Sequence, residues 1–168
     1  MARAEPAGEG QRILVLKRDK LGDMLLTTPL LAVLRERLPG AAIEVLASDY
    51  NAWVLGGNPH VDRVWVYRRS RVGNGISVVG GLQQAILGAR LRFERFDVAI
   101  AAQGESSPRA TRRARWVGAA RTIAYVDPGE PKVSDPLAPP GAGHERDRMI
   151  GLLAPLGIGI PQEPPTPR

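Results

Sequence analysis

Residues 13–29 read Ile-Leu-Val-Leu-Lys-Arg-Asp-Lys-Leu-Gly-Asp-Met-Leu-Leu-Thr-Thr-Pro. The four apolar residues at 13–16 predict a short buried strand, and a polar turn follows from Lys17 to Gly22. A periodic apolar helix then begins, with Asp23 in its first turn. Ligands of open parallel sheets bind beyond the carboxyl ends of the strands. This loop therefore places two lysines, an arginine and two carboxylates where α/β proteins do chemistry.

The rest of the chain continues this alternation. Further strands are predicted at 42–47, 61–67, 97–102 and 121–126, and helices at 23–38, 49–55, 77–92, 108–117 and 145–156. Pro29 lies inside the first helix and should either kink it or mark a second start. Residues 127–143 are rich in Pro, Gly and Asp, which predicts a loop. Strands alternating with helices predict an α/β fold with a doubly wound parallel sheet.

Composition narrows the function classes. The 168 residues contain no cysteine, which excludes disulfides and thiol chemistry, and two histidines are too few for a histidine-built metal centre. No apolar run approaches the roughly 20 residues that span a bilayer, and the N-terminus lacks the apolar core of a signal peptide, so a cytoplasmic protein is expected. The net charge of +6 favours anionic partners such as nucleotide phosphates, although an arginine-rich genome would produce the same excess.

Residues 13–29 resemble the first strand, loop and helix of glycosyltransferase family 9, the lipopolysaccharide heptosyltransferases. The positions that have the family's spacing are Lys17, Leu21, Gly22, Asp23, Thr27 and Pro29. Three later segments also resemble family motifs: Gly-Asn-Pro-His-Val-Asp at 57–62, Phe-Asp-Val-Ala-Ile at 96–100 and His-Glu-Arg-Asp at 144–147. The resemblance runs from about Arg12 to Ile160.

The resemblance implies a Rossmann-like fold, the N-terminal half of a GT-B glycosyltransferase. Family members have two such halves and roughly twice this length. The expected organisation is a disordered tail at 1–11, an acceptor-side domain at 12–160 and the start of an interdomain linker or a tail at 161–168. On this interpretation the nucleotide-sugar half is absent, and the isolated chain is expected to show no turnover.

The resemblance further implies inverting, metal-independent transfer of a sugar from a nucleotide-diphosphate donor, such as ADP-heptose, to a lipopolysaccharide-like or other glycan acceptor, without a cofactor. Asp23 is expected to be the general base. Lys17, Lys20 and Gly22 are expected to bind the donor diphosphate. The expected acceptor-binding residues are Thr27, Arg68, Arg69, Arg71 and Gln103. From its position alone, Asp23 also fits a simple helix cap.

The expected partners are a nucleotide-sugar, an anionic glycan or glycolipid acceptor, a separate chain carrying the second GT-B domain, and peripheral contact with the inner membrane surface. Arginines at 109, 112, 113 and 115 form a second basic cluster, for which a solvated helix face is the favoured interpretation. The alternative function is a non-catalytic Rossmann-like module that binds anionic glycolipid or nucleic acid. No zinc-ligand spacing or nucleic-acid-binding motif supports the nucleic-acid version.

Overall fold

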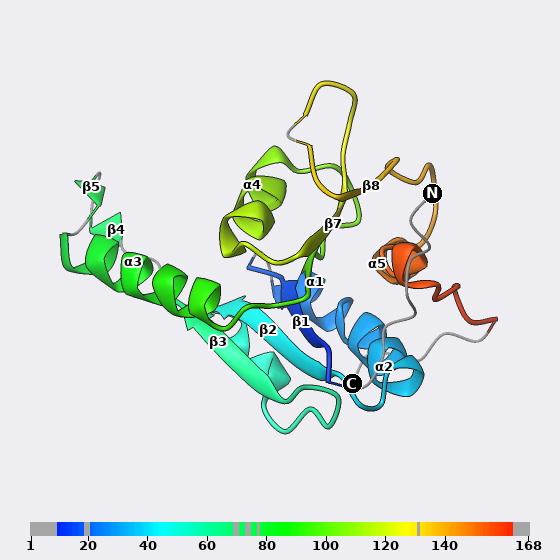
Figure 1. The fold of residues 1–168 in the computed structure, drawn as a ribbon, viewed down its shortest axis with the longest axis horizontal. Coiled ribbons are helices and arrows are strands. Elements are labelled where there is room, and N and C mark those ends of the chain that lie inside the picture. Colours follow the sequence, from blue (N-terminus) through cyan, green and yellow to red (C-terminus); the bar gives the residue numbers. More distant parts are fainter. Residues whose placement is uncertain are drawn as a thin grey trace.

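The computed structural model describes residues 10–18, 21–68, 71–72, 75–76, 78–130 and 132–162. Its centre is a six-stranded sheet in the order β3-β2-β1-β6-β7-β8, with every neighbouring pair parallel (Figure 1). The strands are β1 (Arg12–Leu16), β2 (Ala42–Ser48), β3 (Arg63–Tyr67), β6 (Val98–Ala101), β7 (Arg121–Tyr125) and β8 (Asp135–Leu137). The strand order reverses beside β1, as in the Rossmann fold, so the predicted fold class is confirmed.

Helices cover both faces of the sheet. They are α1 (Leu21–Leu25), α2 (Thr28–Arg37), α3 (Val78–Phe93), α4 (Pro108–Val117) and α5 (Glu145–Gly151), with 3₁₀ turns at Ala52–Leu55 and Ala154–Leu156. A small antiparallel hairpin, β4 (Arg71–Val72) and β5 (Gly75–Ile76), precedes α3. Side chains of α2 and α5 pack on one face of the sheet, and those of α3 and α4 pack on the other. Figure 1 shows where these helices lie around the sheet.

Strand β1 supplies both cores because its side chains alternate. Ile13 and Val15 are fully buried in the core with α2 and α5, whereas Leu14 is fully buried in the core with α3 and α4. Successive residues of a strand point to opposite faces, and a strand covered on both faces therefore reads as an unbroken apolar run. This explains why the segment 13–16 is recognisable in the sequence.

Pro29 marks a second helix start. Helix α1 ends at Leu25, and α2 begins at Thr28 with Pro29 in its first turn. The first-turn N–H groups of a helix have no intrahelical acceptor, so proline loses no hydrogen bond there. The second of the two expectations for this proline is therefore the one that the structure shows.

The loop predicted at 127–143 is wrong in part, because it contains the edge strand β8. Polar side chains rather than an apolar pattern hold this strand. The Arg121 guanidinium bonds both carboxylate oxygens of Asp135 at 2.6 and 3.1 Å, and the Ser134 hydroxyl accepts from Thr122 N. The ion pair raises the pKa of Arg121. The last helix also ends earlier than predicted, at Gly151 rather than 156.

Two aspartates fix the amino ends of neighbouring strands in the same way. Asp97, before β6, accepts from Arg12 N at 2.7 Å and donates its own N–H to Arg12 O at 3.0 Å. Asp62, before β3, accepts from Ile43 N at 2.7 Å and donates its N–H to Ile43 O at 2.8 Å. Each carboxylate accepts a hydrogen bond from the backbone N–H at the start of the neighbouring strand, where the hydrogen bonds between the two strands begin. The aspartates of the Phe-Asp-Val and Asn-Pro-His-Val-Asp segments therefore have structural tasks.

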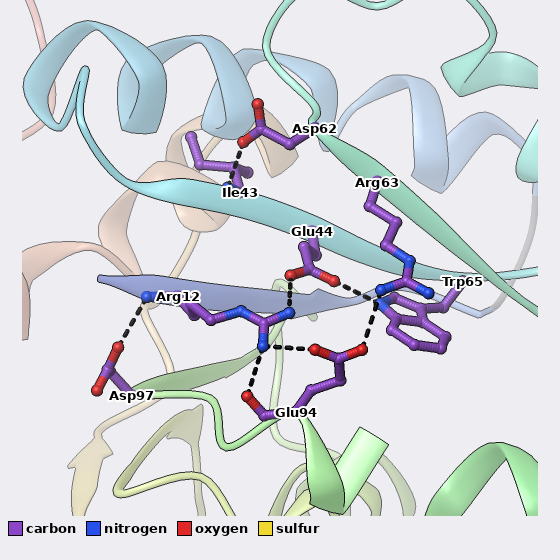
Figure 2. A network of polar contacts seen from close by, with 8 residues as sticks. All are labelled: Arg12, Ile43, Glu44, Asp62, Arg63, Trp65, Glu94 and Asp97. Carbon is purple, nitrogen blue, oxygen red and sulfur yellow. Dashed lines mark hydrogen bonds and ion pairs between the residues drawn. The ribbon is translucent and has the colours of Figure 1, made fainter. Parts of the chain in front are cut away.

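A charged network joins β1, β2, β3 and the residue that follows α3 at this amino edge of the sheet (Figure 2). The Arg12 guanidinium donates to the buried Glu44 carboxylate at 2.5 Å and to Glu94 O at 2.6 Å. Trp65 Nε1 donates to the other oxygen of Glu44 at 2.7 Å, and Arg63 bonds Glu94 at 3.0 Å. The hydrogen bond from Arg12 lowers the pKa of Glu94, and Arg63 adds to this effect. All these groups hold elements together at the edge opposite the carboxyl ends of the strands.

Candidate functional site

The candidate site lies where the strand order reverses, between the carboxyl ends of β1 and β6. Lys17 follows β1 directly, and Gln103 lies two residues after the end of β6. The Lys17 ammonium donates to Gln103 Oε1 at 3.3 Å. Diverging connections leave a crevice at such a point, and open α/β sheets bind their ligands there. The structure therefore brings two of the predicted site residues together at the expected edge.

Asp23 joins this pair from the first turn of α1. Its Oδ2 lies 3.8 Å from Lys17 Nζ. The Lys17 side chain is only 1% exposed, whereas that of Asp23 is 37% exposed. A buried ammonium thus contacts a carboxylate that remains open to solvent. Such a carboxylate can accept a hydrogen bond, or a proton, from a ligand hydroxyl in the crevice.

Thr27 has a structural task in this crevice wall. Its side chain is fully buried, and its hydroxyl donates to Asp23 O at 2.7 Å. The residue thereby closes the turn between α1 and α2 and fixes the backbone that carries Asp23. The structure shows this bond to the backbone, and the acceptor-binding role expected of Thr27 stays a prediction.

Three predicted site residues lie wholly or partly outside the described residues. Lys20 and Arg69 lie outside the described residues, and the Arg71 side chain does too, although its backbone belongs to β4. Gly22 is described and exposed in α1, and a Cβ atom added there would meet nothing within 4 Å. Space alone therefore does not demand glycine at this position.

A basic hollow adjoins the crevice on the other face of the sheet. It has a volume of about 190 Å³ and lies beside the N-terminus of α4. Its lining residues are Leu16, Arg18, Gln103, Ser107, Arg109, Ala110 and Arg113. Side chains alternate along β1 and into the turn, so Lys17 and Arg18 leave the strand on opposite faces. Gln103 takes part in both the crevice and the hollow, because it accepts a hydrogen bond from Lys17 and also lines the hollow.

The basic hollow continues into a groove between α3, α4 and the end of β3. A second hollow of about 260 Å³ shares Arg18 and Arg113 with the first and reaches Tyr67 and Trp116. A third, of about 180 Å³, shares Tyr67 with the second and ends at the exposed Arg68. We call the three together the arginine groove. The Arg18 guanidinium lies over the Tyr67 ring, 3.2 Å from its centre, and so bridges the ends of β1 and β3.

Sequence reasoning missed three of the groove's arginines. Arg18 was not among the predicted site residues, and Arg109 and Arg113 were assigned to a solvated helix face; all three line one hollow, in which Arg109 remains exposed. The sequence did contain a signal for Arg18. If the alternation of side chains along β1 continues past the end of the strand, Arg18 lies on the same face of the sheet as Leu14 and Leu16. Arg68, which was predicted, follows β3. Because β3 lies two strands from β1 in the sheet, the ends of these two strands are about 10 Å apart at ordinary strand spacing.

The described part of the chain contains neither of two other kinds of site, a metal-ligand cluster or a membrane-spanning helix. Within it, no three His, Cys, Asp or Glu side chains are gathered so as to hold a metal ion. None of its helices is long and apolar enough to cross a membrane.

The sheet order and the crevice define the chain as a Rossmann-like α/β domain of the kind found in GT-B glycosyltransferases. It resembles the glycosyl transferase family 9 structure from Veillonella parvula with a TM-score of 0.71 and 24% identity, over 90% of this chain and 42% of that one. Against Escherichia coli heptosyltransferase WaaC with ADP, the TM-score is 0.71 and the identity 17%, over 91% of this chain and 50% of that one.

A further solved structure, E. coli ADP-heptose lps heptosyltransferase II, matches 67% of this chain and 30% of its own, with a TM-score of 0.51 and 23% identity. The chain therefore spans half or less of the length of these structures. No protein-family model and no curated protein matches the sequence. At these identities the comparisons confirm the expected resemblance at the level of the fold.

Proposed function

We propose that this chain is the acceptor-side half of an inverting glycosyltransferase of the heptosyltransferase type. The observation that carries the proposal is the solvent-open Asp23 carboxylate held on the buried Lys17 ammonium at the point where the strand order reverses. The likeness of the fold to a heptosyltransferase solved with ADP and to one solved with ADP-2-deoxy-2-fluoro heptose supports a nucleotide-sugar donor.

In the proposed reaction the acceptor hydroxyl oxygen attacks the anomeric carbon of the donor sugar. Its proton passes to the Asp23 carboxylate, a new C–O bond forms, and the bond to the nucleoside diphosphate breaks with its electron pair leaving on the diphosphate. Lys17 positions Asp23 in this scheme. A direct contact of Lys17 with the donor diphosphate requires its ammonium to become exposed, because it is 1% exposed here.

The arginine groove supplies the acceptor side. Arg18, Arg109 and Arg113 surround one hollow, and Arg68 stands at the far end. Guanidinium groups bind carboxylates and phosphates through paired hydrogen bonds, which suits an anionic glycan such as the core of a lipopolysaccharide. The acceptor would lie across the sheet edge, with its attacking hydroxyl at the Asp23 end.

The donor would be held by a second Rossmann-like half, on the same polypeptide or on a companion chain. Because this chain spans half or less of the matched structures, we expect it to bind acceptor by itself and to transfer sugar only when that half is present.

Two measurements test the proposal. Calorimetric titration of the chain with an anionic lipopolysaccharide core oligosaccharide should show binding that weakens in Arg109→Gln and Arg113→Gln. With the second half supplied, transfer from ADP-heptose should be lost in Asp23→Asn, while acceptor binding persists. Asp49→Asn is the matched control, since Asp49 is an exposed acid just after β2 at the same sheet edge.

Undiminished transfer by Asp23→Asn would overturn the assignment of the base. Acceptor binding without transfer, even with the second half present, would instead favour the non-catalytic binding module.

A further inference from the structure

The turn that follows β2 presents two exposed aromatic side chains at the carboxyl edge of the sheet. Tyr50 is 63% exposed, and Trp53, in the 3₁₀ turn at Ala52–Leu55, is 67% exposed. Tyrosine and tryptophan combine a large apolar ring with a polar atom, and they are enriched where a protein meets a partner that is partly apolar and partly polar. Two such side chains on one short turn indicate a binding surface, which we call the aromatic platform.

The turn that carries the aromatic platform is held in place by a buried amide. Asn51 is fully buried, and its Oδ1 accepts hydrogen bonds from Ser48 N at 2.8 Å and from Ser48 Oγ at 2.9 Å. The Trp53 indole N–H donates to Tyr50 O at 3.1 Å, which fixes the indole against the turn. Groups that are ordered before a ligand arrives lose little conformational entropy on binding. The platform is therefore preorganised.

The aromatic platform lies on the same face of the sheet as Asp23. Leu55 of the 3₁₀ turn and Met24 of α1 are buried in one core, and α1 contacts this turn directly. Strand β2, which leads into the turn, is the neighbour of β1, which leads into Lys17. The arginine groove is on the opposite face. A glycan whose reacting sugar lies at Asp23 would therefore place its next units on the platform.

Charge separates the aromatic platform from the arginine groove. Residues 49–59 contain one acid, Asp49, and neither lysine nor arginine. Three other aromatic rings of the protein lie under a guanidinium, whereas no guanidinium of the described residues lies over Tyr50 or Trp53. The platform thus offers no cation to a phosphate or carboxylate.

An uncharged sugar matches these properties. One face of a pyranose ring presents C–H groups, whose partial positive charge complements the negative face of an aromatic ring. The hydroxyls at the rim of the sugar can donate to the exposed Asp49 carboxylate beside the two rings.

A protein partner fits less well because the surface is small. Aromatic side chains offer about 150–250 Å² each, so the exposed fractions of Tyr50 and Trp53 amount to roughly 200–330 Å² together. A stable protein–protein interface buries about 800 Å² on each partner. An area of this size matches one or two sugar rings.

We propose that Tyr50 and Trp53 form a subsite for uncharged sugar units of the acceptor, next to the sugar whose hydroxyl lies at Asp23. This inference rests on the proposed transferase function and deepens it, because it assigns specificity to two different surfaces. Charged units of the glycan occupy the arginine groove, and neutral units stack on the aromatic platform.

Calorimetric titration with a neutral oligosaccharide of heptose and glucose tests the subsite. The wild-type chain should bind this probe, and Trp53→Ala should bind it at least about tenfold more weakly, because the apolar contact of the indole ring is lost. Tyr50→Ala should weaken binding by about fivefold, and Trp53→Phe, which retains a ring, should lose less than Trp53→Ala. The matched control is Phe93→Ala, since Phe93 is an aromatic residue that is 88% exposed on α3.

Kinetics with the second half supplied give an independent readout. Trp53→Ala should raise KM for a lipopolysaccharide core oligosaccharide and leave kcat unchanged, whereas Asp23→Asn should remove transfer. Sugar binding that depends on Trp53, in a protein that transfers no sugar, would contradict the transferase proposal and leave the subsite standing.

Three results would overturn the subsite while leaving the transferase proposal intact. They are no binding of the neutral oligosaccharide by the wild-type chain, equal binding by Trp53→Ala and the wild type, and loss of association with the second half in Trp53→Ala without a change in sugar binding. The last result would assign the platform to a protein contact.

Discussion

Gly88 of α3 lies directly against the Trp116 ring of α4, so that a Cβ atom added at Gly88 would stand 1.4 Å from Cη2 of the indole. This contact sets the distance between the two helices that flank the arginine groove, because any side chain at position 88 would displace the ring.

Gly88→Ala should therefore lower the free energy of unfolding by about 1–3 kcal/mol through overpacking. Gly81→Ala is the matched control on the same helix, where an added Cβ meets nothing within 4 Å. Helix propensity should make that control more stable by about 0.5–1 kcal/mol. Urea denaturation measures both, and equal effects of the two substitutions would contradict the contact.

Asp97→Ala should destabilise the chain by about 1–3 kcal/mol, because it leaves the partly buried Arg12 N–H without its acceptor. Asp97→Asn retains an acceptor oxygen at the same place and should lose less. Thermal unfolding compares the two variants with the wild type. If the asparagine variant were as unstable as the alanine variant, the charge rather than the hydrogen bond would account for the effect.

Removal of the Lys17 side-chain charge and removal of the Asp23 charge should change the stability of the protein by different amounts. Lys17→Met leaves a carboxylate that is 37% exposed and still solvated, so stability should change by less than about 1 kcal/mol. Asp23→Ala leaves the buried ammonium without its anionic partner and should cost about 1–2 kcal/mol. Denaturant midpoints give the comparison, and the reverse order would argue against a buried ammonium at this site.

Acid should weaken the amino-edge network through Glu94, whose pKa lies below its ordinary value of 4.5 chiefly because of Arg12. Since the folded-state pKa is the lower one, this contribution is complete above the unfolded value and disappears as pH falls through the folded one. The stability difference between wild type and Glu94→Gln should thus be constant near neutrality and shrink in acid. Arg63→Gln should reduce this pH dependence only in part, because Arg63 contributes less than Arg12 to the lowered pKa of Glu94. If the stability difference between wild type and Glu94→Gln grew in acid, the prediction would be wrong.

The fold was largely predictable because its signals are local. The run at 13–16 is apolar on both faces of a central strand, and the helix that carries Asp23 begins with a recognisable turn. Strand β8 was missed because an Arg121–Asp135 ion pair and the Ser134 hydroxyl hold it, and such contacts leave no apolar pattern in the sequence.

The sequence predicted the residues of the crevice between β1 and β6, but not those of the hollow beside α4. Lys17, Asp23 and Gln103 follow two strands whose carboxyl ends meet, and the structure brings them together. The hollow around Arg109 and Arg113 depends on how α4 is placed against the end of β1, which no local pattern specifies. The roles of these residues in binding and transfer stay predictions.

The alternation at the end of β1 limits how this protein can vary. Lys17 and Arg18 are consecutive, yet one serves the crevice with Asp23 and the other the arginine groove. Inserting or deleting a single residue within β1 would exchange the two faces, sending the ammonium to the groove and the guanidinium to the core. Natural variants should therefore keep the residue count of β1 constant.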